Sequence, residues 1–245
     1  MKILCMMPAA KGVYPPEAEA RRVNLMRSYG SPATQIDVDY LPDVSGFVPW
    51  GGGGAPSGAA ERAGQLSAQR AVQAEREGYD AFCPFGGLDI GIQEAKRVVS
   101  IPVVGQTEAC FLFCALLGQP FANCIYMPGS EEGIRSRARD AGVDHLLVAI
   151  TAIGIPNSEY PQRRGELLER FVACAHEARE KGAALMGRVA MSICPTEYPA
   201  KELSVASGMP VLDGLACQIA MAEWWHRTGL PPSLLRIPRG AASAG

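Results

Sequence analysis

The sequence has few of the residues that hold catalytic metals. Its 245 residues include only three histidines, His145, His176 and His226, and these form no HxH or HExxH spacing. The cysteines form no CxxC pair. Cys110 and Cys114 are four residues apart, but apolar neighbours favour buried core thiols over a metal pair. We therefore expect no metal site.

The chain also lacks a long apolar run and an excess of basic charge. No stretch of about 18 apolar residues occurs, so we expect no membrane span. The segment 1–8 is too short for the apolar region of a signal peptide, so we expect a cytoplasmic protein whose eight cysteines are thiols. The net charge of −2, without a visible basic patch, argues against nucleic-acid binding.

Short apolar strands alternate with helical segments along the chain. We expect strands at 2–7, 35–41, 81–84, 101–104, 123–127, 145–151, within 184–193, and at 210–212. We expect helices at 17–29, 60–77, 90–99, 107–117, 130–141, 162–181, 196–206 and 215–227. This alternation predicts an α/β fold with parallel strands and helices on both faces. In such folds the ligand lies beyond the carboxyl ends of the strands.

The two halves of the chain resemble each other. Segments 101–105 and 209–213 each join an X-Pro-Val strand to an apolar helix, and Pro102 matches Pro210 at an offset of 108 residues. The same offset places Cys194 opposite Gly86. We therefore expect two pseudo-symmetric parallel-sheet α/β lobes, residues 1–104 plus 214–245 and residues 105–213, with the active site in the cleft between them. Generic similarity between two βαβ units is the alternative.

Candidate ligand contacts from the first half follow predicted strands. Gly86 and Gly87 leave room for backbone N–H groups to approach an anionic oxygen, and they also suit a tight turn. Thr107 and Glu108 lie at a helix start, where they bind substrate or stabilise the helix end. Asp213, after the last strand, is expected to cap the final helix.

Candidate residues from the second half surround Cys194. This thiol follows an apolar run and is either an acid–base or nucleophilic group or one more buried cysteine. Ser192 or Thr196 orients the thiol or binds a carboxylate, with capping of the next helix as an equal alternative. Arg188 is a charge near an apolar strand, which indicates either carboxylate binding or a misplaced strand boundary.

A run of four glycines at 51–54 follows Trp50. It lacks the Lys-Ser/Thr of a P-loop, so phosphate binding is poorly supported. A lid over a ligand and a flexible linker explain the run equally well.

Several segments resemble the aspartate/glutamate/hydantoin racemase superfamily, most closely its hydantoin/allantoin racemase branch. The carrying segments are Gly78-Tyr79-Asp80-Ala81-Phe82 through Asp89-Ile90-Gly91, Ile101-Pro102-Val103-Val104-Gly105 with Glu108, Ala152-Ile153-Gly154-Ile155-Pro156, and Met209-Pro210-Val211-Leu212-Asp213-Gly214. Each motif is loose, but their order and spacing are more specific. The resemblance extends from about Gly78 to Trp225.

The resemblance implies proton transfer, without a cofactor, at a carbon next to a carbonyl. In the family, two cysteines act as acid and base on opposite sides of the substrate. Here the first family cysteine falls on Gly86, while the second matches Cys194; Cys83 is a less favoured substitute for the first. One thiol opposite a glycine resembles arylmalonate decarboxylase of the same superfamily.

These features favour an isomerase of the racemase class, with Cys194 carrying the proton. The expected substrate is a small hydantoin-like or carboxylated compound, and we expect a homo-oligomer. The alternatives are a decarboxylase-type lyase with one cysteine, a cyclic-amide hydrolase with a cysteine nucleophile, and a binding protein without catalysis.

Overall fold

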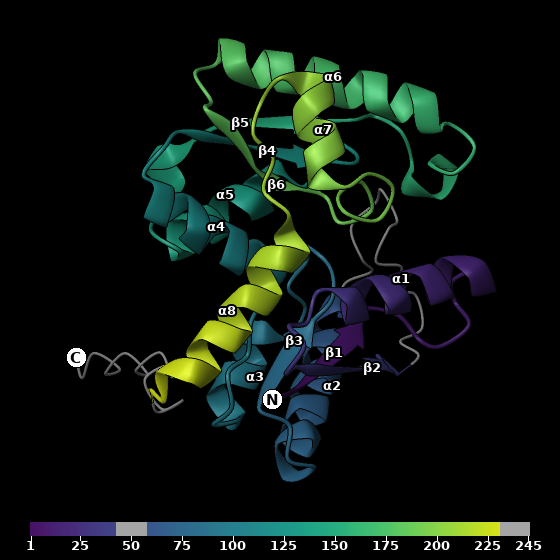
Figure 1. Ribbon diagram of the computed structural model, residues 1–245, viewed down its shortest axis with the longest axis vertical. Coiled ribbons are helices and arrows are strands. Elements are labelled where there is room, and N and C mark those ends of the chain that lie inside the picture. The colour runs from purple at the N-terminus through teal and green to yellow at the C-terminus, as the bar shows by residue number, and fades with distance from the viewer. Residues whose placement is uncertain (43–57, 231–245) are drawn as a thin grey trace.

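The computed structural model describes residues 1–42 and 58–230, so the glycine run 51–54, Trp50 and the tail from residue 231 lie outside the described residues. The described residues contain two three-stranded parallel sheets. In the first, β1 (Lys2–Met7) lies between β2 (Gln35–Tyr40) and β3 (Ala81–Pro84). In the second, β4 (Phe121–Ile125) lies between β5 (Leu147–Ala152) and β6 (Leu185–Val189). The expected α/β fold of two lobes is confirmed (Figure 1).

Helices connect the strands and cover the sheets (Figure 1). They are α1 (Pro16–Ser28), α2 (Ala59–Arg76), α3 (Ile92–Val98), α4 (Gln106–Leu117), α5 (Glu131–Asp140), α6 (Arg164–Glu180), α7 (Ala200–Ser207) and α8 (Gly214–Thr228). Two short 3-10 turns, Asp144–Leu146 and Asn157–Glu159, flank β5.

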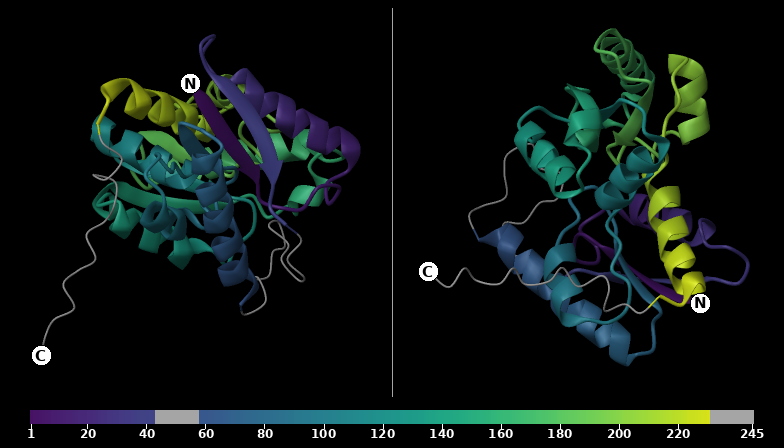
Figure 2. Two further views of the ribbon diagram at one scale, coloured as in Figure 1. Left: turned by 90° about the horizontal axis from the view of Figure 1, so that it is seen from below. Right: turned by 90° about the vertical axis from the view of Figure 1, so that its left-hand side faces the viewer.

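Both faces of each sheet are buried, as parallel sheets require. In β1, Ile3, Cys5 and Met7 pack in the core that contains α1 and α8, whereas Leu4 and Met6 pack in the core that contains α2 and α3. Figure 2 shows α2 beside the first sheet and α8 on another side of it. The second sheet is likewise covered, by α6 and α7 on one face and by α4 and α5 on the other.

The two lobes are connected by α4 and α8, which pack against each other. Helix α4 also packs on β6, and α8 packs on β3. Helix α4 therefore follows the first sheet in the chain but packs on the second, whereas α8 follows the second sheet but packs on the first. A division at residues 104 and 213 remains our proposal for the lobe boundaries.

Two expected strands and one expected helix depart most from their expected extent, while other elements shift by one or two residues at their ends. Segments 101–104 and 210–212 each contribute only one isolated bridge, at Val103 and Val211, because Pro102 and Pro210 have no N–H to extend the ladder. The helix expected at 196–206 begins at Ala200, after Pro199. Residues 190–198 instead form successive turns, and proline is tolerated only in the first turn of a helix.

The expected pairing of Gly86 with Cys194 is also corrected. Phe82 donates its N–H to the carbonyl of Pro102, and Met186 donates its N–H to that of Pro210. Phe82 and Met186 are therefore equivalent, at an offset of 104 residues instead of 108. Applied to the strand ends, this offset places Ala190 opposite Gly86. The second half has four more residues between Met186 and Pro210 than the first half has between Phe82 and Pro102. The offset of 108 residues measured at the two prolines therefore does not apply at the ends of β3 and β6.

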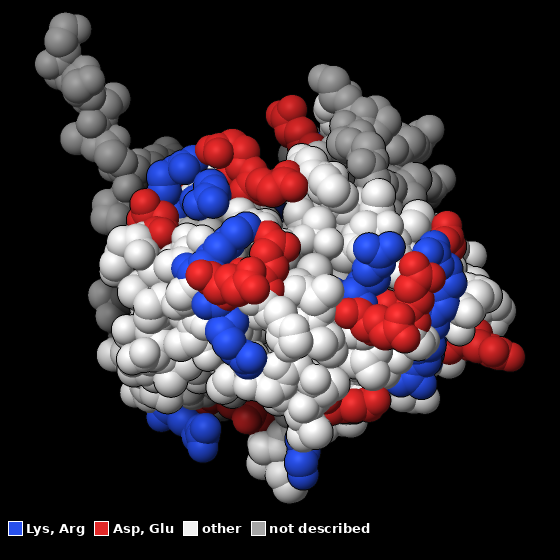
Figure 3. All heavy atoms as spheres, turned by 90° about the horizontal axis from the view of Figure 1, so that it is seen from above, with Lys and Arg blue, Asp and Glu red and all other residues white. Residues whose placement is uncertain are grey.

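The described surface carries charges of both signs. On the face over α6, acidic and basic side chains lie beside one another (Figure 3). Arg163 pairs with Glu159 and Glu166, and Lys181 pairs with Glu177. Among the described helices, none combines the length and the apolar character needed to cross a membrane.

Candidate functional site

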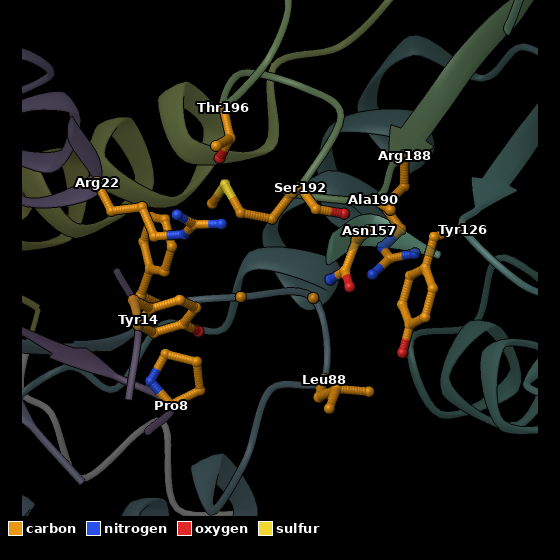
Figure 4. Close-up of a pocket in the computed structure, with 14 residues that line it drawn as sticks. Pro8, Tyr14, Arg22, Leu88, Tyr126, Asn157, Arg188, Ala190, Ser192 and Thr196 are labelled. Atoms are coloured by element: carbon orange, nitrogen blue, oxygen red, sulfur yellow. The ribbon is translucent and has the colours of Figure 1, made fainter. Parts of the chain in front are cut away.

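A pocket lies at the carboxyl ends of β3 and β6, where the two halves face each other. The cavity measures about 90 Å³ and opens to solvent. This is less than the roughly 300–1,000 Å³ of pockets for drug-sized ligands, so the site suits a small ligand. The lining comes from the loop after β1, α1, the loop after β3, the ends of β4 and β6, and the turn at Asn157 (Figure 4).

Arg188 reaches this pocket because of a bulge in β6. Ala122 pairs with Met186 and Asn123 pairs with Arg188, so Gly187 is an extra residue in the ladder. A bulge changes the side to which the following side chain points. Gly187 is required there, since a Cβ at this position would lie 2.4 Å from the Cys114 sulfur.

The guanidinium of Arg188 is held by neutral partners. Its Nε donates to the Thr107 hydroxyl at 3.1 Å, and Nη1 donates to the Asn123 side-chain oxygen at 3.3 Å. The third nitrogen, Nη2, lies against Gly87, where a Cβ would be only 1.7 Å away. Gly87 therefore provides the space that this guanidinium occupies, while its carbonyl accepts hydrogen bonds from Thr107 and Arg137.

The opposite wall comes from the first 22 residues. Tyr14 and Arg22 line the pocket with Pro8, and the Arg22 guanidinium lies 4.5 Å from the centre of the Tyr14 ring. Burial raises the pKa of Tyr14 to about 12 and lowers the pKa of Arg22. Figure 4 shows Arg22 and Arg188 reaching toward the same space from opposite sides, with Ser192 and Asn157 between them.

Cys194 does not line this pocket. The residue is fully buried, with an exposed fraction of 0%. Burial, with smaller contributions from Asp213 and Cys217, raises the pKa of its thiol well above the usual value. The thiol is therefore protonated at neutral pH. Its catalytic role stays a prediction, and in this conformation the pocket walls present Gly86 and Ala190 at the strand ends.

The other predicted residues fall into two groups. Gly86, Gly87, Ser192 and Thr196 line the pocket, and the Thr196 hydroxyl has no hydrogen-bond partner among the described residues. Thr107 and Glu108 do not line it. The Thr107 hydroxyl instead donates to the Gly87 carbonyl and accepts from Arg188 Nε.

Three acidic side chains have partners within the protein. Glu108 forms an ion pair with Lys96, and the other two accept hydrogen bonds at helix starts. Asp89 accepts hydrogen bonds from the backbone N–H groups of Thr107 and Glu108, at 3.0 Å each. Asp213 accepts from the N–H groups of two residues at the start of α8, so the expected cap is confirmed.

Sequence reasoning missed Tyr14, Arg22, Tyr126 and Asn157 as pocket residues. Tyr14 lies in the loop after β1, and Tyr126 directly follows β4. Both obey the rule that ligands bind beyond the carboxyl ends of parallel strands, so a search of every strand end would have found them. Arg22, inside α1, gave no such signal.

All eight cysteines are free and buried. Among residues 1–42 and 58–230, no group of three or more His, Cys, Asp or Glu side chains is arranged to hold a metal ion.

Comparison with known proteins gives one related sequence and several related structures. No family model matches the chain. The hydantoin racemase of Rhizobium meliloti is 28% identical over 180 residues, which cover 71% of this chain and 72% of that protein. The allantoin racemase of Klebsiella pneumoniae matches with a TM-score of 0.78 at 18% identity, over 100% of this chain and 96% of that one.

Two further structures share the fold. The allantoin racemase of Pseudomonas fluorescens gives a TM-score of 0.75 at 21% identity, with both chains fully covered. In sequence the chain is thus similar to a hydantoin racemase, and in fold to allantoin racemases. Arylmalonate decarboxylase gives a TM-score of 0.57 at 13% identity over 94% of each chain. The similarity to a hydantoin racemase supports an isomerase of the racemase class.

Proposed function

We propose that this chain is a cofactor-independent isomerase that moves a proton at a carbon next to a carbonyl. The substrate in this proposal is a small hydantoin-like or carboxylated compound. The observation that carries it is the pocket between two equivalent strand ends, in a chain whose sequence relative is a hydantoin racemase. Removing a proton from one face and returning one to the other inverts the carbon.

The pocket offers polar groups for the charge that develops on the carbonyl oxygen. Ser192 and Thr196 line it, as do the glycines at 86 and 87, of which Gly86 is partly exposed. Donors fixed around a developing oxyanion lower the barrier to proton abstraction. We assign Ser192, Thr196, Gly86 and Gly87 to substrate binding.

We propose Cys194 as the thiol that delivers a proton. Its raised pKa suits a donor better than a base, because the thiol stays protonated at neutral pH. The residue lies within the turns of residues 190–198, between two pocket-lining hydroxyl residues in sequence. A rearrangement of these turns is required to bring its sulfur to the ligand.

Exchange of the substrate's α-proton in deuterated water tests the activity, and Cys194→Ser and Cys194→Ala test the thiol. Cys174→Ala is the matched control, because Cys174 is a buried thiol that does not line the pocket. We expect the wild type and Cys174→Ala to exchange the proton and invert the carbon. Both Cys194 variants should lose inversion, because the thiol delivers the proton to the new face. Inversion that survives in Cys194→Ala refutes the role of this thiol but leaves the isomerase intact.

A decarboxylase-type lyase is the second candidate, and the absence of a side chain at Gly86 together with a buried arginine in the pocket favours it. Such an enzyme releases carbon dioxide from a malonate-like substrate, and the resulting enediolate accepts one proton. Carbon dioxide release without prior α-proton exchange would select this reaction over the isomerase.

We also propose a homo-oligomer that buries apolar side chains on the outside of α4 and α8. Leu116 is 80% exposed, and Leu112, Leu117 and Trp224 are exposed as well. Light scattering coupled to gel filtration tests the mass. A monomer at micromolar concentration would overturn this assembly.

A further inference from the structure

The strongest unexplained feature of the pocket is the buried charge of Arg188. The residue is only 5% exposed, although its guanidinium borders the pocket. Its two hydrogen-bonded nitrogens contact the neutral side chains of Thr107 and Asn123. No described side chain accepts a hydrogen bond from Nη2.

A buried guanidinium ordinarily has a carboxylate partner, because an unpaired charge is costly to remove from water. Arg188 forms no ion pair with any carboxylate of residues 1–42 or 58–230. Asp89 is the acidic group that acts on it electrostatically, but backbone N–H groups already occupy both Asp89 oxygens. Arg137, which binds the Gly87 carbonyl, adds positive charge nearby.

The opposite wall repeats this excess of positive charge. The Arg22 guanidinium stacks on the Tyr14 ring and donates one hydrogen bond to a carbonyl of its own helix, that of Ala18. It forms no ion pair with a described carboxylate; Glu197, which acts on it electrostatically, pairs with Arg21 at 3.4 Å. A ligand between the two walls therefore meets two guanidinium groups without carboxylate partners (Figure 4).

We infer that the ligand carries a carboxylate that binds Arg188 and a second oxygen-bearing group that faces Arg22. Guanidinium groups bind carboxylates by paired, charge-assisted hydrogen bonds, which a neutral ring cannot equal. This assignment narrows the proposed substrate to carboxylated compounds and makes Arg188 a specificity-determining residue. It depends on the proposed function only for the location of the site.

The test compares ligands of equal shape and different charge. Hydantoin-5-acetic acid and its primary amide have the same ring and side-chain length, and methylmalonate is an acyclic carboxylate. Calorimetric titrations use wild type, Arg188→Met, Arg188→Lys and Arg22→Met. Arg135→Met is the control, because Arg135 is an exposed arginine on α5 outside the pocket.

We expect the wild type and Arg135→Met to bind the acid at least about tenfold more tightly than the amide, the value of one hydrogen bond to a charged group. Arg188→Met should lose this preference while keeping its affinity for the amide, and Arg188→Lys should recover part of it. Equal binding of acid and amide by the wild type, or no binding of either acid, overturns the inference. The comparison of acid and amide binding by the wild type tests the inference even if Arg188→Met fails to fold.

The outcome is separable from that of the proposed isomerase. Selective acid binding that depends on Arg188, without α-proton exchange on any tested compound, supports this inference and refutes the activity. Exchange on neutral hydantoins that is unchanged in Arg188→Met supports the activity and refutes this inference.

Discussion

Replacing Gly87 by alanine tests the placement of the Arg188 guanidinium. The added Cβ would lie 1.7 Å from Nη2, 2.7 Å from Cζ and 3.1 Å from Nε of Arg188, so the guanidinium must move. Moving it breaks its bonds to Thr107 and Asn123. Overpacking typically costs about 1–3 kcal/mol, and a hydrogen bond to a charged group contributes about 1.5–3 kcal/mol. With partial relaxation, we expect Gly87→Ala to lower the free energy of unfolding by about 2–4 kcal/mol.

Urea and thermal unfolding, followed by circular dichroism, measure this loss. For a chain of this length it corresponds to a decrease in Tm of about 4–16 °C. Gly133→Ala is the control, because Gly133 is exposed within α5 and a Cβ there would have no neighbour within 4 Å. It should leave stability unchanged or raise it by about 0.4–1 kcal/mol.

A double-mutant cycle separates this clash from other effects of the substitution. In an Arg188→Met background the charged obstacle is gone, so Gly87→Ala should cost at least about 1 kcal/mol less than in the wild type. If Gly87→Ala unfolds like the wild type and keeps its preference for carboxylates, the contact between Gly87 and Arg188 is refuted.

Three further predictions concern other residues. Cys194 should react with iodoacetamide near neutral pH more slowly than an unfolded cysteine, because it is buried and its pKa is raised; peptide mapping that finds fast labelling would contradict its placement. Asp213→Ala should destabilise the protein by about 1–2 kcal/mol in urea unfolding through loss of the α8 cap, whereas Asp213→Asn should retain most of that cap. Tyr14 has a folded-state pKa of about 12 against about 10 when unfolded, so its contribution to stability is present below pH 10 and is lost as pH rises to about 12. Tyr14→Phe should therefore show a smaller alkaline loss of stability than the wild type.

The order of strands and helices was predictable because the hydrophobic segments are short and separate. Strands β1 and β3 have the predicted bounds, and α2, α5 and α8 differ by one residue at each end. The helix expected at 196–206 begins late because Pro199 interrupts it, and the apolar pattern alone did not show that interruption.

The candidate site was predicted less completely because its side chains depend on tertiary geometry. The bulge at Gly187 decides where Arg188 points, and no alternation pattern in β6 reveals an extra residue. The four-residue difference between the halves shifted the residue opposite Gly86 from Cys194 to Ala190. Tyr14 and Arg22 were missed because the family resemblance began only at Gly78, beyond both residues.

The correspondence between Gly86 and Ala190 has a stereochemical consequence. The two strand ends are related by pseudo-symmetry, yet neither residue bears a proton-donating side chain, and the hydroxyls of Ser192 and Thr196 lie on one side only. A flat enolate held between these walls presents chemically different faces. In the decarboxylase-type reaction, a proton supplied only from one wall yields product of a single handedness. The isomerase reaches the equilibrium mixture of enantiomers whichever wall donates, so the inequality of the two strand ends sets the handedness of the product only in the lyase.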